Sequence, residues 1–537
     1  MKITDILQRY NHLRSIRDGY WLDTWREVRH YCYPNEEEGL TEGGKRGTEI
    51  FDTTAITSCQ RLASGIYAWM LDPAKRMIEI IAADKELQKK SDVKQFYAAL
   101  SKKLLEKIAN SNYATIVQKM LKTCACGIDG VVYLESGMDG TVRFQHIPIE
   151  SVCYQENSDG RVNTVFREMN MTAIQILEKF ANDNIPDKIR QEAADPKRMD
   201  TKHKILHAVF PRGKSDKSML DNKNFAFADY YIHIDTKTLI RESGFVEFPF
   251  FVCRFEVASG ESYGRGPGID LLPDIKMLNR MRQSYIIGSE RANDPDTLIP
   301  ENSLVDETWN REAGATHFYR MGANGEKPEY MYYPVNLAQI GNDIERERQN
   351  IKNGFYLDIF DPLGDIKNIT ATEAEIRNEG KLVPFSTLVG NIHSDFLAPM
   401  IHRLIGIMAR NFELEDMPVE VMENSKYNIE FVSKIALAIK QSEASNYLRF
   451  EAAMQGMLAR HPEVEDNIRI DDTFREIALS VGINPDMLTT EAERDKKRAE
   501  VAEQQNAQMQ SEMLANEAKA LGSMGGVEEL EKLEEVI

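Results

Sequence analysis

The stretch Tyr263–Pro300, YGRGPGIDLLPDIKMLNRMRQSYIIGSERANDPDTLIP, carries more information about the fold than any other part of the chain. Its glycines at 264, 266 and 268 predict a tight turn with positive φ, and Pro273 is typical of a first helical turn. Apolar residues at helical spacing then predict an amphipathic helix over about 270–292, which the motif Asn-Asp-Pro ends. Such a helix is stable only when its apolar stripe packs against another element.

The same stretch resembles the portal, or head-to-tail connector, proteins of short-tailed bacteriophages. Further segments similar to that family follow in the family order, over about residues 10–415. They are YCYP (31–34), FDTTA and LASGIYAWMLDP (within 51–73), GIDGVVYLE (127–135), VFREMNMTAIQILEKF (165–180), ILHAVFPR (205–212), GFVEFPFFVCRF (244–255) and TATEAEIRNEGKL (370–382). Each segment is short, but their shared order and spacing are specific.

The resemblance implies an α+β portal fold that assembles as a cyclic homo-oligomer of twelve copies. The parts it implies are a mixed α/β wing (1–269), a first stem helix (270–293), a small α/β clip (294–336), a second stem helix (337–360), a tunnel loop (361–370), a kinked wing helix with a return strand (371–433), a helical crown (434–521) and an acidic flexible tail (522–537).

Residue patterns alone predict the elements inside these parts. Helices are expected at 1–34, 53–71, 92–126 (two helices), 172–182, 337–357, 371–411, 434–460, 471–481 and 491–520, and strands within 128–168 and at 204–212, 226–235, 238–255 and 427–433. Asp139-Gly140 and Asp159-Gly160 predict hairpin turns, and Pro384 predicts a kink in the long helix. Two helices that flank the excursion 294–335 can stand side by side with the excursion at their far end.

The composition argues against a membrane-spanning protein, a secreted disulfide-rich protein and a protein that wraps nucleic acid. A chain of 537 residues with 42% hydrophobic residues can form several domains, and no apolar run approaches the roughly 18–20 residues of a bilayer span. The first residues lack a signal-peptide core and the six cysteines lack a disulfide spacing, so we expect assembly in the host cytoplasm and a final location in the virion, at a capsid vertex. The net charge of −19, or −228 for twelve copies, argues against a protein that wraps nucleic acid. It is compatible with a channel through which DNA slides without being held tightly.

Two sets of residues are candidates for contact with DNA in the channel. Lys367 and Asn368 fall in the tunnel loop that the resemblance implies. Arg346, Arg348 and Lys352 lie on the second stem helix, where Glu345 and Glu347 alternate with them. The simpler interpretation of this second set is a series of ion pairs within or between subunits, each worth little when exposed.

The excursion between the stem helices is unusually aromatic. Its candidates for docking a partner are Trp309, Phe318, Tyr319, Tyr330 and Tyr332. Aromatic side chains are common anchors at interfaces, but the same residues can form a small β core between neighbouring subunits. From the resemblance we expect the large terminase and a tail adaptor protein as partners, besides the major capsid protein, scaffolding proteins and double-stranded DNA in the channel.

Motifs for catalysis, cofactors or metals are weak. The G-x-x-x-x-G-K spacing that ends at Lys45 is followed by Arg46 instead of Ser or Thr, and no strand pattern precedes it. His203 and His207 are expected to pack at a surface or interface, and Cys124 and Cys126 are expected to be buried apolar side chains. We therefore predict no enzyme, no cofactor and no metal; the alternatives are an NTPase or nuclease of the packaging machine, or a tail adaptor ring.

Overall fold

The computed structural model describes residues 2–36, 44–75, 77–137, 140–181, 183–213, 221–298, 329–331, 336–360, 385–414, 417–423, 426–431, 471, 474 and 491–523. The chain divides into two compact units, one formed by residues 1–85 and 95–435 and the other by 86–94 and 436–537. The predicted tunnel loop, most of the predicted clip and most of the predicted crown lie outside the described residues.

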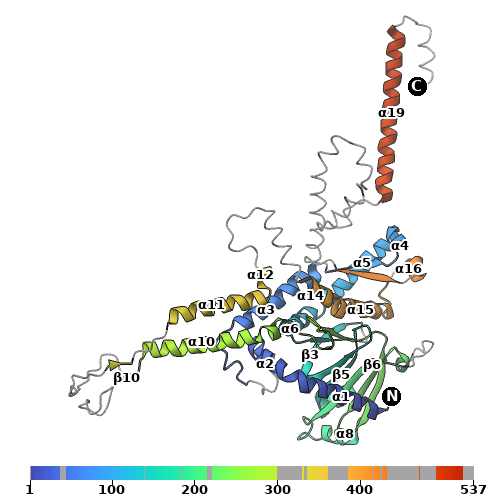
Figure 1. The fold of residues 1–537 in the computed structure, drawn as a ribbon. Helices are drawn as coiled ribbons and strands as arrows, with labels where there is room; N and C mark the ends of the chain where they lie inside the picture. Colours follow the sequence, from blue (N-terminus) through green and yellow to red (C-terminus); the bar gives the residue numbers. More distant parts are fainter. Residues whose placement is uncertain are drawn as a thin grey trace. The chain divides into compact units, whose positions relative to one another are not determined.

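The first 125 residues are mainly helical, as the apolar spacing predicts (Figure 1). The elements are α1 (Ile3–Tyr20), α2 (Leu22–Cys32), η1 (Pro34–Glu36), α3 (Thr54–Ile66), the π-turn η2 (Tyr67–Leu71), η3 (Pro73–Lys75), α4 (Lys85–Lys89), α5 (Ser91–Ala109) and α6 (Tyr113–Ala125). The predicted helices at 1–34, 53–71 and 92–126 are confirmed.

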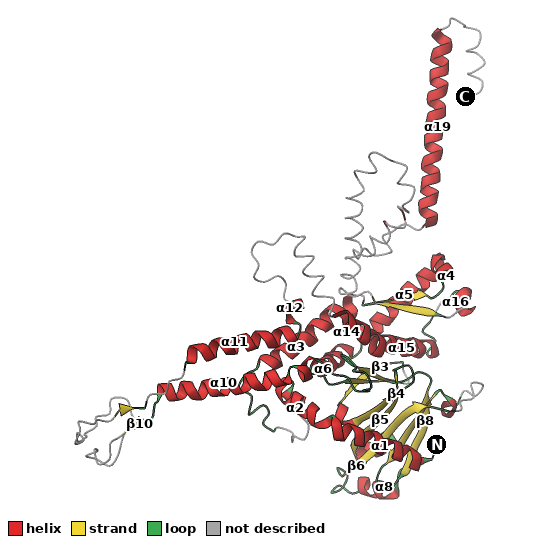
Figure 2. Ribbon diagram, in the orientation of Figure 1, coloured by secondary structure: helices red, strands yellow, loops and turns green. Residues whose placement is uncertain are grey.

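A five-stranded antiparallel sheet forms the centre of the mixed body. Each strand pairs with the next in the order β4 (Val152–Glu156), β5 (Val162–Thr172), β6 (Lys202–Pro211), β7 (Phe227–His233) and β8 (Thr238–Phe245). Side chains alternate across β6, so Leu206 and Phe210 pack with α1 while Ile205 packs with α7 (Ala173–Lys179) and α8 (Asp187–Ala194). Helices therefore cover both faces of this sheet, and Figure 2 shows α1 lying across one of them.

A smaller antiparallel sheet has the order β3 (Val142–Ile147), β2 (Gly130–Ser136) and β9 (Phe250–Cys253). The single strand predicted over 238–255 was wrong, because this segment supplies β8 to one sheet and β9 to the other. Pro249 stands just before β9, and a proline has no N–H to continue a ladder. The short 3-10 turns η4 (Ile149–Ser151) and η5 (Asn222–Asn224) precede β4 and β7. The predicted turns are present: Gly140 and Gly160 have φ of +77° and +72°.

Two long helices lie side by side beyond the mixed body (Figures 1 and 2). The short α9 (Pro267–Asp270) leads into α10 (Leu272–Asn293), with Pro273 in its first turn, and α11 (Leu337–Gly354) is followed by α12 (Leu357–Phe360). At the outer end of α10, β10 (Thr297–Leu298) pairs with β11 (Glu329–Tyr330). The expected pair of neighbouring helices is therefore confirmed, and the described ends of the excursion lie at the far end of that pair.

The helix after the predicted tunnel loop departs from α geometry at Ile392–Leu397. Residues 385–410 run through α14 (Phe385–Asn391), the π-helix η6 (Ile392–Leu397) and α15 (Ala398–Arg410). Pro399 lies in the first turn of α15 and has no N–H for the preceding turn, which explains a π-segment there. Pro384, where we predicted the kink, lies outside the described residues.

Two further strands close the first unit. After α16 (Val419–Glu423), β12 (Tyr427–Phe431) pairs antiparallel with β1 (Ile78–Ala82), so that Ile78 faces Phe431. The strand β12 was predicted and β1 was not. In the second unit, α19 (Glu491–Ser523) confirms the predicted helix at 491–520, and apolar side chains such as Met509 and Met513 are exposed on it. The predicted helices at 434–460 and, except for residues 471 and 474, 471–481 lie outside the described residues.

Candidate functional site: the helical stem and its anchors

The glycine turn that begins the stem is built for close packing. Gly266 is extended at φ −168°, and neither Gly264 nor Gly268 has a positive φ, so the predicted reason for these glycines was wrong. A Cβ atom on Gly268 would lie 2.4 Å from the carbonyl oxygen of Cys126, and one on Gly264 would lie 2.6 Å from the carboxylate of Asp129. The turn therefore needs glycine because other atoms occupy the space of a side chain.

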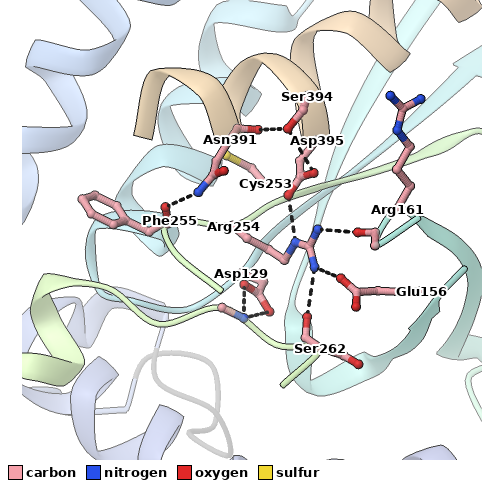
Figure 3. Close-up of polar contacts among 12 residues, drawn as sticks. Asp129, Glu156, Arg161, Cys253, Arg254, Phe255, Ser262, Asn391, Ser394 and Asp395 are labelled. Atoms are coloured by element: carbon pink, nitrogen blue, oxygen red, sulfur yellow. Dashed lines mark hydrogen bonds and ion pairs between the residues drawn. The ribbon is translucent and has the colours of Figure 1, made fainter. Parts of the chain in front are cut away.

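A buried arginine ties this turn to the rest of the body (Figure 3). Arg254, only 4% exposed, follows β9 and donates to the Oδ2 atom of Asp395 at 2.8 Å. It also pairs with the carboxylate of Glu156 and donates to the carbonyl oxygens of Ser262 (3.2 Å) and Gly160 (3.1 Å). We call this set the Arg254 junction, because one guanidinium joins the end of β4, its hairpin, the segment before the glycine turn and the π-helix η6.

Asp129 extends the junction into the turn itself. Its carboxylate accepts hydrogen bonds from the hydroxyl of Tyr154 (2.6 Å) and the amide of Gly264 (3.0 Å). Complete burial, the largest influence on this group, raises the pKa of Asp129 to about 7, although both hydrogen bonds oppose the rise. Tyr154 also contacts the ring of Tyr263 at 4.6 Å between centroids, so the first residue of the turn is held by its side chain as well.

A second anchor joins both stem helices to the segment that precedes α3. Asn279 of α10 accepts hydrogen bonds from the amides of Phe51 (2.7 Å) and Asp52 (3.3 Å). From α11, Arg348 donates to Oδ2 of Asp52 through Nε (2.9 Å) and Nη2 (2.7 Å). Burial alone would raise the pKa of Asp52, but hydrogen bonds from Thr54 and Arg348 outweigh it, so this pKa lies below its ordinary value. We call this set the Asp52 anchor.

A cavity of about 540 Å³ lies beside the Asp52 anchor. Its wall contains the cationic side chains of Arg61, Arg282, Arg348 and Lys352 and the carboxylates of Asp52 and Glu345. Because Arg348 is already paired with Asp52 and also with Glu345, the remaining cations give this wall a positive balance. The wall can therefore attract an anionic group.

The structure separates the predicted DNA-channel residues. Arg346 lies on the exposed side of α11 with its side chain 70% exposed, next to Asp343 at 3.4 Å. Arg348 belongs to the Asp52 anchor, whereas Lys352 lines the cavity beside it. Lys367 and Asn368 lie outside the described residues. The arrangement of Arg348 agrees with the simpler interpretation of these cations, an ion pair within the chain.

Of the predicted docking residues, Tyr330 is described. It lies on β11 and is 72% exposed, and its neighbours Leu298 on β10 and Met331 are 56% and 41% exposed. The other four, Trp309, Phe318, Tyr319 and Tyr332, lie outside the described residues.

The histidines and cysteines singled out in the sequence are buried. His203 and His207 lie on β6 and contact carboxylate oxygens of Glu192 (2.7 Å) and Asp229 (2.9 Å), so the expected surface or interface position was wrong. A strand between two helical layers buries both of its faces, which a spacing of four residues cannot reveal. Cys124 and Cys126 are buried free thiols, as predicted.

Sequence reasoning missed the Arg254 junction and the Asp52 anchor. A signal was present, because Arg254 stands in the apolar run FPFFVCRF and Asp129 in GIDGVV. A single charge within an apolar run indicates a buried and paired group. Asn279 and Asp52 carry no comparable signal.

The sequence matches one family of known proteins over most of its length. Residues 4–488 match the family model of the bacteriophage head to tail connecting protein, and the chain belongs to that family. The resemblance stated from the sequence is therefore confirmed. Among the described helices, none has the length and apolarity needed to cross a bilayer.

Two curated relatives match almost end to end. The "Probable portal protein" of Bordetella phage BPP-1 is 26% identical over 532 residues, which cover 97% of this chain and 95% of the relative. The "Portal protein" of Salmonella phage epsilon15 is 26% identical over 532 residues, 96% of this chain and 93% of the relative. A solved chain from the "Virion of native gene transfer agent (GTA) particle" overlaps 80% of this chain and 89% of its own length, at 10% identity and a TM-score of 0.34, too low for a conclusion.

Proposed function

We propose that this chain is a bacteriophage portal protein. Twelve copies form a ring at one vertex of the capsid, and the genome enters through its channel during packaging and leaves through it during ejection. The main support is the family match over residues 4–488, together with two relatives of nearly equal length that are named portal proteins. The paired helices α10 and α11 and their anchors supply a rigid stem for such a ring.

In this proposal, part of the stem and the tunnel loop contact the DNA. Of the predicted channel residues, Arg346, which is exposed, and Lys352, in the wall of the cationic cavity, are proposed to meet phosphates. Lys367 and Asn368 are proposed to do so from the tunnel loop. A few cations in a chain of net charge −19 allow weak, transient contacts, which suit a duplex that must slide.

The outer end of the stem is the proposed docking site for the large terminase during packaging and for a tail adaptor protein afterwards. The exposed apolar side chains of Leu298, Tyr330 and Met331 surround the β10–β11 pair. Trp309, Phe318, Tyr319 and Tyr332 belong to the same proposed clip. The wing would meet the major capsid and scaffolding proteins, and we assign no catalytic step to this chain, because the ATP-driven motor is the terminase.

The mass of the purified particle tests the ring. Twelve copies of the 61.3 kDa chain form a particle of about 736 kDa, which mass photometry can measure and negative-stain microscopy can display as a ring with a central hole. A chain that stays monomeric in solution and inside intact phage particles would refute the proposal. ATP turnover that Lys45→Ala abolishes would favour the enzyme instead.

The DNA contacts need a separate test, because a ring can form without them. Lys367→Ala and Arg346→Ala should leave the mass of the particle unchanged and alter the amount of nuclease-protected DNA in phage heads. Tyr330→Ala should leave the mass of the purified ring unchanged but weaken the binding of terminase to it. Unchanged DNA content in the first two variants would remove these residues from the channel.

A further inference from the structure

The mixed body contains a cavity that the portal function does not use. It has a volume of about 300 Å³ and lies where β2, β7, β8, α7 and α15 meet. This volume is at the lower end of the range for small-molecule sites, roughly 300–1,000 Å³. Its wall is rich in polar groups, so a bound molecule would have to be polar.

Three hydrogen-bond donors in this wall lack an acceptor. Tyr133 and Tyr231 are each 5% exposed, and neither hydroxyl makes a hydrogen bond with any residue that the structure describes. The ammonium of Lys179 lies 5.5 Å from the ring centroid of Tyr231 and has no carboxylate at ion-pair distance among the described residues. Lys179 is an exposed residue and neither tyrosine hydroxyl is fully buried, so water reaches all three donors, and the oxygens of a bound anion could replace that water.

The opposite side of the cavity has more cations than nearby carboxylates. Arg403, 4% exposed, donates to the carbonyl oxygens of Leu134 (3.3 and 3.2 Å) and Glu247 (2.8 Å), and its nearest carboxylate oxygen, on Glu247, is 3.9 Å away. That carboxylate is bound by both terminal nitrogens of Arg410 at 2.6 and 2.7 Å. One carboxylate thus serves two guanidinium groups. A third cation, Arg241, is paired with Asp183 at 2.6 Å and adds no free charge.

Two carboxylates in the wall would repel an anion, and only one of them already has a hydrogen-bond partner. Asp229 is occupied, because its Oδ1 atom contacts Nε2 of His207 at 2.9 Å. Glu135 has no ion pair or hydrogen bond within the described part of the chain. It lowers the local potential, so the donors would hold an anion less tightly than they could without it.

We propose that this cavity binds a small oxyanion, a molecule with phosphate or clustered carboxylate groups. Lys179 supplies the charge, and the hydroxyls of Tyr133 and Tyr231 donate hydrogen bonds to its oxygens. Arg403 adds a fixed positive charge at the opposite wall. The volume admits inorganic phosphate or citrate, and the lining residues of the cavity all belong to one chain.

Isothermal titration of the purified full chain with inorganic phosphate, and separately with citrate, tests this site at constant ionic strength. We expect saturable binding of at least one of the two, and the tighter one identifies the class of oxyanion. Lys179→Met should weaken binding roughly tenfold or more, because a hydrogen bond to a charged group is lost. Lys188→Met is the matched control, since Lys188 is an exposed lysine on α8 outside the cavity, and it should change nothing.

Two further variants keep the test decisive if Lys179→Met fails to fold. Tyr231→Phe keeps the ring that stacks on His207 and removes only the hydroxyl, so it should weaken binding roughly threefold to tenfold. Glu135→Gln should tighten binding, because it removes the repelling charge. The proposal is overturned if neither oxyanion binds saturably, if Lys188→Met weakens binding as much as Lys179→Met, or if Glu135→Gln weakens it.

Discussion

Replacing Arg254 by Met tests whether the Arg254 junction holds the stem to the body. Met fills much of the same space but removes the cation from two carboxylates, Asp395 and Glu156, whose side chains are 13% and 20% exposed. Removing one partner of a buried ion pair costs about 3–5 kcal/mol. Because both carboxylates keep some contact with water, we expect a loss at the lower end, about 3 kcal/mol.

Urea unfolding followed by tryptophan fluorescence measures this loss close to the junction. The ring centroids of Trp21 and Trp25 lie 5.6 and 5.2 Å from that of Tyr263, the first residue of the glycine turn. The variant should therefore shift the midpoint of the fluorescence transition to lower urea. Arg254→Lys is the matched control, because it keeps the charge but not the planar group that reaches all four acceptors, and it should lose less.

A double-mutant cycle with Asp395→Asn separates the ion pair from a general effect on packing. If the pair matters, the double variant should lose less than the sum of the single losses, because Asn leaves no buried anion behind. Additive losses, or a loss below about 1 kcal/mol for Arg254→Met alone, would refute the view that this arginine holds the junction.

Three further outcomes follow from the anchors. Gly268→Ala places a Cβ atom 2.4 Å from the carbonyl oxygen of Cys126 and should cost about 1–3 kcal/mol in urea unfolding; a neutral effect would contradict the close-packing explanation. Folded Asp129 keeps its proton up to about pH 7 while the unfolded group ionises near pH 4, so the wild type should lose stability as pH rises from 4 to 7, and Asp129→Asn should flatten that slope. Arg348→Met should lower the thermal midpoint because it leaves a buried carboxylate unpaired, whereas Arg346→Met should stay within about 0.5 kcal/mol of wild type; equal effects would argue against the Asp52 anchor.

The sequence pattern predicted those helices and turns that depend only on residues close together in the chain. The apolar spacing of residues 272–293 and 337–354 is enough for two helices, and Asp159-Gly160 marks a hairpin because glycine readily takes the positive φ of that turn. The two-helix stem with its excursion could thus be expected before the structure. The family resemblance, rather than periodicity, supplied the ring and the channel.

Contacts between distant residues could not be predicted in this way. The strand β1 is only five residues long, and its partner β12 lies about 350 residues further along, so no neighbouring turn reveals the pair. The spacing on α11 likewise cannot tell that Arg348 meets Asp52 while Arg346 faces solvent. The glycines of the YGRGPG turn were recognised as necessary for the wrong reason, since the atoms that exclude a side chain belong to residues 126–129.

The pairing of β10 with β11 determines how the segment between these strands is joined to the stem helices. Because Thr297 faces Tyr330 and Leu298 faces Glu329, the polypeptide leaves the helical pair and returns to it at the same place. A force exerted on the segment between these strands would therefore reach the helices through this one pair of strands.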